Sequence, residues 1–298
     1  MSLSQWSEKI LQLLSRMNNF YSPGSCRASC FRFEINGAQV GWIPPQVAPL
    51  LSRFPDVFSP PQGSAVSLRP SLDSHGRRSE AVDAVLQTLR QEGIFSCLKG
   101  WRDEKYSVMS KFSEPPLMSM ERSATSLFGV KRSGVHINGY TVSDGGEVSM
   151  WLARRSSTKQ TYPGLLDNVQ VVWRLGLTSN KLRSKNVRRR HAFQQPLRRR
   201  LVLLAHYTYE DEDGVFPESQ YVFDLELPVG FKPKVGDGEV QEFYLLPMDK
   251  VKELLATEDF KPNCAMVVLD FLIRHSLIDP DTEPCYQEFG AGLHQTLD

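Results

Sequence analysis

The sequence predicts an α/β protein in two parts, in which a smaller α/β module precedes a larger domain built around a sheet. Three observations support this class. The chain has 298 residues, which is more than one domain usually holds. The first half combines a strand pair with a helix. The second half places strands before two helices, an order typical of an α/β or α+β domain.

The first element is an amphipathic helix predicted over residues 3–17, where apolar residues recur at helical spacing. Ser2 and Gln5 have the spacing of a capping box at its start. A helix docked on the protein surface is the favoured interpretation. A mitochondrial presequence is the alternative, and Glu8 together with the low arginine content argues against it.

A hairpin and a second helix follow. Alternating residues 30–35 and 39–43 predict two strands, and the Asn-Gly pair at 36–37 predicts the tight turn between them. After a Pro-, Ser- and Gly-rich loop, a helix is predicted from Ser79 to Glu92, with Ser79 as its N-cap and Gly93 as its stop. These elements form the smaller module.

The second half is rich in strands. Strands are predicted over residues 134–142, 147–155, 220–227 and 240–246. Two helices follow, over 249–256 and over the mostly apolar segment 263–275. Pro115 and Pro116 mark the expected boundary, which gives a module over 1–118, a domain over 119–276 and a tail over 277–298.

Composition narrows the class of protein. Hydrophobic residues make up 41% of the chain, enough for one core per domain. The sequence contains no run of 18 apolar residues and no secretory signal, so we expect a cytoplasmic protein with no membrane contact. Five irregularly spaced cysteines predict reduced thiols rather than a disulfide framework or a zinc site.

One stretch, residues 170–206, differs from the rest in charge. It contains ten Lys or Arg residues and no Asp or Glu. Without these ten, 25 basic residues stand against 34 acidic ones, a net charge of −9, so a mildly acidic protein carries one strongly basic insert. The ten cations are Arg174, Lys181, Arg183, Lys185, Arg188, Arg189, Arg190, Arg198, Arg199 and Arg200.

Several strings around this insert resemble the Nudix hydrolase family. They are 151–156, 162–168, 207–210 and 235–243 in the second half, and 41–44 and 100–104 in the first half. The branch resembled also has an N-terminal module shared with fungal thiamine pyrophosphokinase proteins. The resemblance covers nearly the whole chain except 170–206, and it implies a Nudix-like α/β/α sandwich with a mixed sheet.

In this family, the string at 162–167 leads into the Nudix box, G-x5-E-x7-R-E-U-x-E-E-x-G-U, in which U is aliphatic. Glutamates at i, i+3 and i+4 share one helix face and converge on Mg²⁺, which prefers carboxylate oxygens. The metal neutralises phosphate charge and activates water. This chain has no glutamate and no Gly-Gly pair there, and arginine side chains repel a cation.

An out-of-frame translation of residues 170 to about 205 would explain the replaced box. With one permitted set of codons, the frame that begins at the last base of the Lys185 codon reads Glu-Cys-Glu-Glu-Glu-Ala-Cys-Ile. The same offset at Val169 reads Ala-Gly-Gly-Leu-Ala-Ala-Gly. The first of those glycine codons precedes the first glutamate codon by the box spacing. We therefore hypothesise a frameshift, from compensating insertions and deletions or an error in the sequence.

Three residues outside the insert are candidate site residues. The resemblance implies that Glu239, on the strand that follows the box, helps bind metal or acts as a catalytic base; a solvated carboxylate at a strand end is the plainer interpretation. Arg154 and Arg155 are candidates for contact with a substrate phosphate. His136 is expected to be a core or edge-strand histidine. The acidic run 210–213 is expected to be a hairpin turn, with stray metal affinity as the alternative.

The resemblance implies a Mg²⁺- or Mn²⁺-dependent pyrophosphohydrolase of small diphosphates, such as thiamine diphosphate derivatives or oxidised nucleoside diphosphates like 8-oxo-dGDP. We expect this chain to hold the metal poorly and to be weak or inactive. The alternative is a non-catalytic, box-less Nudix scaffold that binds a ligand or partner. Nucleic-acid binding by the basic insert is the least favoured interpretation, because the rest of the chain is acidic and shows no RNA-binding motif.

Overall fold

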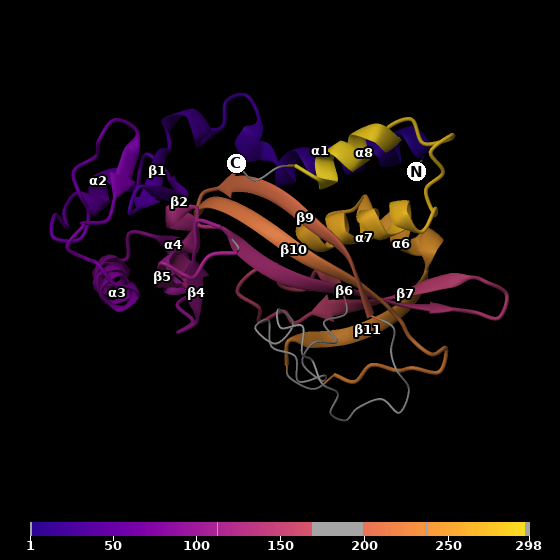
Figure 1. The fold of residues 1–298 in the computed structure, drawn as a ribbon. Coiled ribbons are helices and arrows are strands. Elements are labelled where there is room, and N and C mark those ends of the chain that lie inside the picture. The colour runs from indigo at the N-terminus through magenta and orange to yellow at the C-terminus, as the bar shows by residue number, and fades with distance from the viewer. Residues whose placement is uncertain (1, 112, 169–198, 236–237, 296–298) are drawn as a thin grey trace. The chain divides into compact units, whose positions relative to one another are not determined.

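The computed structural model describes residues 2–111, 113–168, 199–235 and 238–295 (Figure 1). The chain divides into two compact units. We call residues 18–132 with 207–218 the small-sheet unit, and residues 1–17, 133–206 and 219–296 the large-sheet unit. This division follows contacts rather than chain order, and the predicted ranges 1–118, 119–276 and 277–298 stay a prediction. The mixed α/β class predicted from the sequence is confirmed.

The small-sheet unit holds a three-stranded sheet in the order β2-β1-β3 and a two-stranded sheet, β4-β5. The strands are β1 (Phe31–Ile35), β2 (Ala38–Ile43), β3 (Ala65–Ser67), β4 (Lys105–Val108) and β5 (Met118–Glu121). The predicted hairpin is confirmed: β1 and β2 pair antiparallel, and both Asn36 (φ 52°) and Gly37 (φ 77°) take the left-handed conformation of the tight turn. Strand β3 pairs with β1 in parallel.

The helices of this unit are mostly short. They are η1 (Asn19–Tyr21), η2 (Cys26–Ser29), α2 (Ala48–Leu51), α3 (His75–Glu92), α4 (Ser96–Lys99) and η3 (Arg122–Phe128). Helix α3 begins one turn before the predicted Ser79, because the Ser74 side chain accepts from the backbone N–H of Arg77 and caps it. Ser79 instead accepts from the N–H of Ser119 through its hydroxyl. The predicted stop is confirmed at Gly93, with φ 68°.

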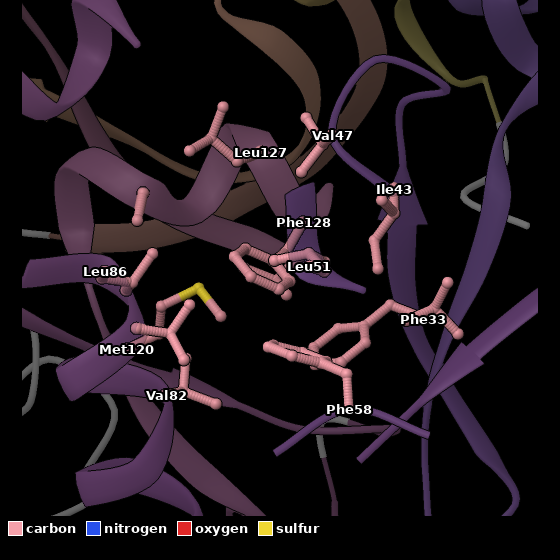
Figure 2. Close-up of a cluster of buried hydrophobic side chains, with 14 of the residues drawn as sticks. Phe33, Ile43, Val47, Leu51, Phe58, Val82, Leu86, Met120, Leu127 and Phe128 are labelled. Carbon is pink, nitrogen blue, oxygen red and sulfur yellow. The ribbon is translucent and has the colours of Figure 1, made fainter. Parts of the chain in front are cut away.

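One apolar core joins these elements, as Figure 2 shows. The Phe128 ring lies 5.1 Å from Phe33 and 6.1 Å from Phe58, centroid to centroid. Val82 and Leu86 of α3 enter the same cluster. Gly41 allows β2 to approach η3 closely, since a Cβ there would lie 2.2 Å from the Phe128 carbonyl oxygen.

The main sheet has six strands in the order β11-β7-β6-β10-β9, with β8 also paired to β7. The strands are β6 (Arg132–Val142), β7 (Val148–Arg155), β8 (Leu166–Asn168), β9 (Arg199–Asp211), β10 (Gly214–Glu226) and β11 (Val240–Pro247). Four of them match predicted strands, whereas β8 and β9 were missed. The acidic run 210–213 lies at the predicted hairpin: Glu212 and Asp213 form the turn between β9 and β10, and Glu210 and Asp211 are the last residues of β9.

Helices gather on one face of this sheet (Figure 1): α1 (Leu3–Met17), α6 (Met248–Leu255), α7 (Pro262–Arg274) and α8 (Tyr286–Leu293). The capping box is confirmed, because the Ser2 N–H donates to Gln5 Oε1 at 3.1 Å and the Gln5 N–H to Ser2 Oγ at 3.3 Å. The predicted tail contains α8, whose Phe289 meets Trp6 edge to face at 5.8 Å. The amphipathic helix α1 therefore packs against α8, a helix that the sequence did not predict.

The replaced box, and any helix or irregular structure predicted within residues 170–198, lie outside the described residues. The end of the basic insert is described as the backbone of β9, which begins at Arg199. In the part of the chain that the structure describes, no helix is long and apolar enough to cross a membrane.

Candidate functional site

The C-terminal end of β7 brings the predicted site residues together. Strand β7 lies between β11 on one side and β8 on the other, with Val240 opposite Arg155 and Leu166 opposite Arg154. Glu239 precedes β11 directly, and its carbonyl oxygen accepts from the Ser156 N–H at 2.9 Å. Three residues separated by up to 85 positions therefore share one end of the sheet.

Arg155 is buried, with 7% of its surface exposed. Its Nε donates to the Tyr162 carbonyl and its Nη2 to the Thr161 carbonyl, both at 2.8 Å, and its Nη1 lies 2.7 Å from Asp167 Oδ2. Tyr162 itself adopts a left-handed backbone, with φ 50°. The guanidinium therefore fastens the loop between β7 and β8 from within.

Arg154 points to another partner and is more exposed. Its Nη2 lies 2.9 Å from Asp259 Oδ2, and its Nη1 contacts both Asp259 Oδ1 and, at 3.0 Å, the Gly164 carbonyl. The hydrogen bond to Asp259 raises the pKa of Arg154. Its guanidinium also lies over the Tyr244 ring at 5.8 Å. Arg154 thus links the same loop to the segment before α7.

Glu239 is paired with a lysine. Lys159 Nζ lies 2.6 Å from Glu239 Oε1, and the two side chains are 28% and 38% exposed. The Lys159 ammonium group thus occupies Oε1, one of the two oxygens of this carboxylate. The roles predicted for Glu239, Arg154 and Arg155 towards metal and substrate stay predictions.

Asp167, on β8, is the charged centre of the site. It is 3% exposed, and besides Arg155 it accepts from the Cys264 thiol at 2.7 Å and faces Lys261 Nζ at 3.7 Å. Burial alone would raise the pKa of Asp167, but Lys261, the Cys264 thiol, His136 and Arg155 together hold it below its ordinary value. The carboxylate is therefore ionised and saturated with donors from this protein.

A chain of buried polar side chains continues from β8 across the sheet. His136 Nδ1 lies 3.3 Å from Asn168 Oδ1, Asn168 Nδ2 donates to Asn138 Oδ1 at 2.8 Å, and Asn138 Nδ2 donates to Asp224 Oδ1 at 3.0 Å. Arg274 then pairs with Asp224 at 2.5 Å. This chain connects β6, β8, β10 and α7, and it confirms His136 as a core histidine.

Cys264 and His136 beside Asp167 superficially resemble a nucleophile with its base. The Cys264 thiol donates to Asp167, however, and lies 3.9 Å from His136 Nδ1. Burial, followed by the Asp167 charge, raises the pKa of Cys264 well above its ordinary value. Cys264 is 0% exposed, so the thiol is inert and structural.

Comparison with known proteins shows to which family the chain belongs. "Nudix hydrolase 24, chloroplastic" of Arabidopsis thaliana is 35% identical over 256 residues, which cover 84% of this chain and 69% of that protein. "Nudix hydrolase 20, chloroplastic" of the same plant is 34% identical over 263 residues, with the same 84% and 69% coverage. The chain belongs to the Nudix hydrolase family. "Uncharacterized protein YJR142W" of Saccharomyces cerevisiae is also similar, 32% identical over 247 residues, 77% of this chain and 71% of that protein.

A second match concerns the first half of this Nudix protein. Residues 9–132 match the family described as "Domain of unknown function (DUF4743)", which confirms a distinct N-terminal module. Among solved structures, the Nudix hydrolase RenU from M. smegmatis matches 50% of this chain and 89% of its own, with 14% identity and a TM-score of 0.31.

The Nudix family implies a divalent metal, so the donors of the described residues matter. No group of three or more His, Cys, Asp or Glu among residues 2–111, 113–168, 199–235 and 238–295 could hold a metal ion. Asp167 is saturated by cations and a thiol, and Glu239 is neutralised by Lys159. These residues do not fit a Mg²⁺ site of their own, and the box segment would have to supply one.

Sequence reasoning missed the centre of the site. In the sequence, Asp167 stands out only as part of the family string 162–168, and no motif points to Lys261 or Cys264. These two partners of Asp167 lie 94 and 97 positions after it in the sequence, so no local pattern could reveal the contacts. One signal was available: Lys261 is a charged residue directly before a mostly apolar helix.

Proposed function

We propose that this chain derives from a Mg²⁺- or Mn²⁺-dependent pyrophosphohydrolase of small diphosphates and that, as written, it has weak or no metal-dependent activity. Thiamine diphosphate derivatives and oxidised nucleoside diphosphates such as 8-oxo-dGDP are the proposed substrate class. One observation carries the proposal: residues 170–206 contain ten cations and no carboxylate at the place where the family has its box.

The electrostatic reason is direct. Hydrolysis of a diphosphate in this family depends on carboxylates that hold a hard divalent cation next to the phosphates. Guanidinium groups have no acceptor and keep their charge at all ordinary pH values. A segment with many arginines at this position would repel the cation and could at most contact the phosphates.

The described residues support the proposal that the chain as written has weak or no metal-dependent activity. Asp167, which lies just before residue 170 in the sequence, and the candidate Glu239 are each paired with a cation of the protein. Freeing Asp167 would leave Arg155 buried without a counter-charge, which is unfavourable. Neither carboxylate is therefore a ready replacement for a box glutamate.

A specific observation also favours the second candidate, a box-less scaffold that binds a ligand or partner without catalysis. Strand β8, which leads into the box position, pairs with β7, and its Asp167 and Asn168 side chains contact Cys264 of α7 and Asn138 of β6. The sheet is thus formed up to Asn168, the last described residue before the charge pattern changes. Binding without turnover would distinguish this candidate.

A turnover assay tests the proposal. Purified chain is incubated with thiamine diphosphate, its oxidised derivatives and 8-oxo-dGDP, with Mg²⁺, Mn²⁺ or EDTA, and released phosphate is measured. We expect release with either metal to equal release with EDTA. Phosphate release that is robust with Mg²⁺ and abolished by EDTA would overturn the proposal. Ligand retention in equilibrium dialysis without release would support the scaffold.

The nucleotide sequence tests the frameshift. We expect the codons for residues 169–176 and 185–193 to be those that encode a Gly-Gly entrance and a glutamate-rich helix in the shifted frame. Sequencing the complementary DNA from independent clones measures this directly. Codons that place stop signals or unrelated residues in the shifted frame would contradict a frameshift, and the basic insert would then be a genuine replacement of the box.

A further inference from the structure

The small-sheet unit contains two thiols in direct contact. Cys26 Sγ lies 3.3 Å from Cys30 Sγ, at the two ends of the single turn η2. The Cys30 N–H donates to the Cys26 carbonyl at 3.0 Å, which fixes the backbone of this turn. We propose that Cys26 and Cys30 form a reversible dithiol–disulfide site that is oxidised by a hydroperoxide. The proposal is independent of the diphosphatase function.

The surroundings favour reaction within the pair. Cys26 is half-buried, whereas Cys30 is 5% exposed and packs against Phe20 and Val215. The Cys26 N–H donates to both oxygens of the Glu210 carboxylate, at 3.0 and 3.1 Å, so the turn is tied to strand β9. The sulfurs are therefore held together, and Cys26 is the more exposed residue of the pair.

The pKa values of the two thiols are shifted in opposite directions. The hydrogen bond from the Cys26 thiol lowers the pKa of Cys30, while burial and the Glu210 charge act against this effect. The same hydrogen bond, followed by burial, raises the pKa of Cys26. The hydrogen bond therefore favours the thiolate on Cys30 over a thiolate on Cys26.

The chemistry balances with the hydroperoxide as oxidant. The Cys30 thiolate attacks one peroxide oxygen, the O–O bond breaks, and the leaving oxygen takes a proton, which gives a sulfenic acid on Cys30. The Cys26 sulfur then attacks Cys30, the S–S bond forms, and the sulfenic oxygen leaves as water with the Cys26 proton. Two thiols lose two electrons, and the peroxide is reduced to an alcohol, or to water, plus water.

A metal site is the competing use of two adjacent thiols. No cluster of three or more His, Cys, Asp or Glu able to hold a metal occurs among the described residues, which include Cys26, Cys30 and Glu210. The Glu210 carboxylate is engaged by the Cys26 backbone. Two thiols alone are fewer than the four ligands of a structural zinc site.

The other three cysteines provide internal controls. Cys97 and Cys285 are half-buried and Cys264 is buried, and no described cysteine other than Cys26 and Cys30 contacts a second thiol. Burial raises the pKa of Cys97 to about 12, which makes it a poor nucleophile. We therefore expect oxidation at Cys26 and Cys30 before oxidation at Cys97 or Cys285.

The test uses the full reduced chain treated with hydrogen peroxide, then with N-ethylmaleimide in denaturant, and digested with trypsin. Trypsin cuts after Arg27, between the two cysteines, so a disulfide joins peptide 17–27 to peptide 28–32. We expect this joined species, about 2 Da below the sum of its parts, to form roughly tenfold faster than the Cys97 thiol is lost. Dithiothreitol should restore both thiols.

Variants complete the design. Cys26→Ser should leave Cys30 to oxidise to sulfinic acid without a joined peptide, and Cys97→Ser should leave the joined peptide unchanged. Circular dichroism of each reduced variant checks the fold. The unsubstituted chain also tests the proposal without any variant. Full maleimide labelling of Cys26 and Cys30 after peroxide treatment would overturn it, and so would oxidation of each cysteine without a cross-link between them.

Discussion

Restoring the box is expected to raise Mg²⁺-dependent phosphate release from small diphosphates by roughly four orders of magnitude, on the order of 5 kcal/mol of transition-state stabilisation. The change replaces residues 170 to about 205 with the shifted-frame sequence, including its Gly-Gly entrance and glutamate-rich helix. The physical reason is that carboxylates on one helix face supply the ligands that arginines cannot. Initial rates with Mg²⁺ and with EDTA measure the gain.

A matched control separates chemistry from folding in this experiment. The restored chain with each helix glutamate changed to glutamine keeps volume and polarity but removes the negative charge. We expect this control to fold like the restored chain and to return to the rate of the chain as written. Equal activity of the restored chain and its glutamine control would show that the carboxylates are not what the original chain lacks.

Asp167→Asn is expected to destabilise the protein by about 3–5 kcal/mol, because it leaves Arg155 and Lys261 facing a buried neutral group. Asn keeps the size of the side chain and removes its charge. Asp167 and Arg155 are 5% and 9% exposed as side chains, so water cannot replace the lost partner. Urea unfolding followed by circular dichroism and tryptophan fluorescence measures the change.

The neighbouring pair on β7 is the matched control. Asp259 pairs with Arg154, but these side chains are 41% and 24% exposed. Asp259→Asn should therefore cost at most about 1 kcal/mol, because solvent screens an exposed pair. A similar loss in both variants would contradict the view that burial of the Asp167 pair sets its energetic weight.

The stability of the protein at low pH should also reveal the contribution of the Asp167 charge. The pKa of Asp167 in the folded protein lies below its ordinary value of 3.8, so its contribution to stability is present above pH 4. That contribution is lost as pH falls from about 4 through the folded-state pKa. The parent should thus lose more stability than Asp167→Asn over this range, and parallel losses would contradict the lowered pKa.

Local sequence signals predicted the elements that are decided locally. The capping box at Ser2 and Gln5, the turn at 36–37 and the stop at Gly93 each depend on residues within one turn of one another. Helix α3 begins earlier than predicted because Ser74 caps it, and both Ser74 and Ser79 are chemically suitable caps. Which of the two serines caps the helix is decided only by the packing of the folded protein.

Elements that depend on distant partners could not be predicted. Strand β8 has three residues and is held between two partners. It pairs with β7 on one side, and on the other its Leu166 N–H donates to the Asp259 carbonyl while its Leu166 carbonyl accepts from the Lys261 N–H. Helix α8 is stabilised by packing on α1, where Phe289 meets Trp6, a residue 283 positions earlier. Neither pairing leaves a period in the sequence that would reveal it.

The candidate site shows the same limit. Arg154, Arg155 and Glu239 were each named as candidates because family strings run through them, and the structure places all three at the C-terminal end of β7. Their partners were not predicted, since Asp259 and Lys159 are ordinary charged residues until the fold places them 2.9 and 2.6 Å away. In the structure, each of the three candidates forms an ion pair with another residue of the protein, and their roles towards metal and substrate stay predictions.

Metal binding by the chain as written tests the central claim most directly. Titration with Mn²⁺, monitored by electron paramagnetic resonance of the free ion, reports any site of moderate affinity without a need for turnover. We predict no saturable binding at concentrations that saturate the box-restored chain. One tightly bound Mn²⁺ per chain, displaced by Mg²⁺ in the protein as written, would contradict the account.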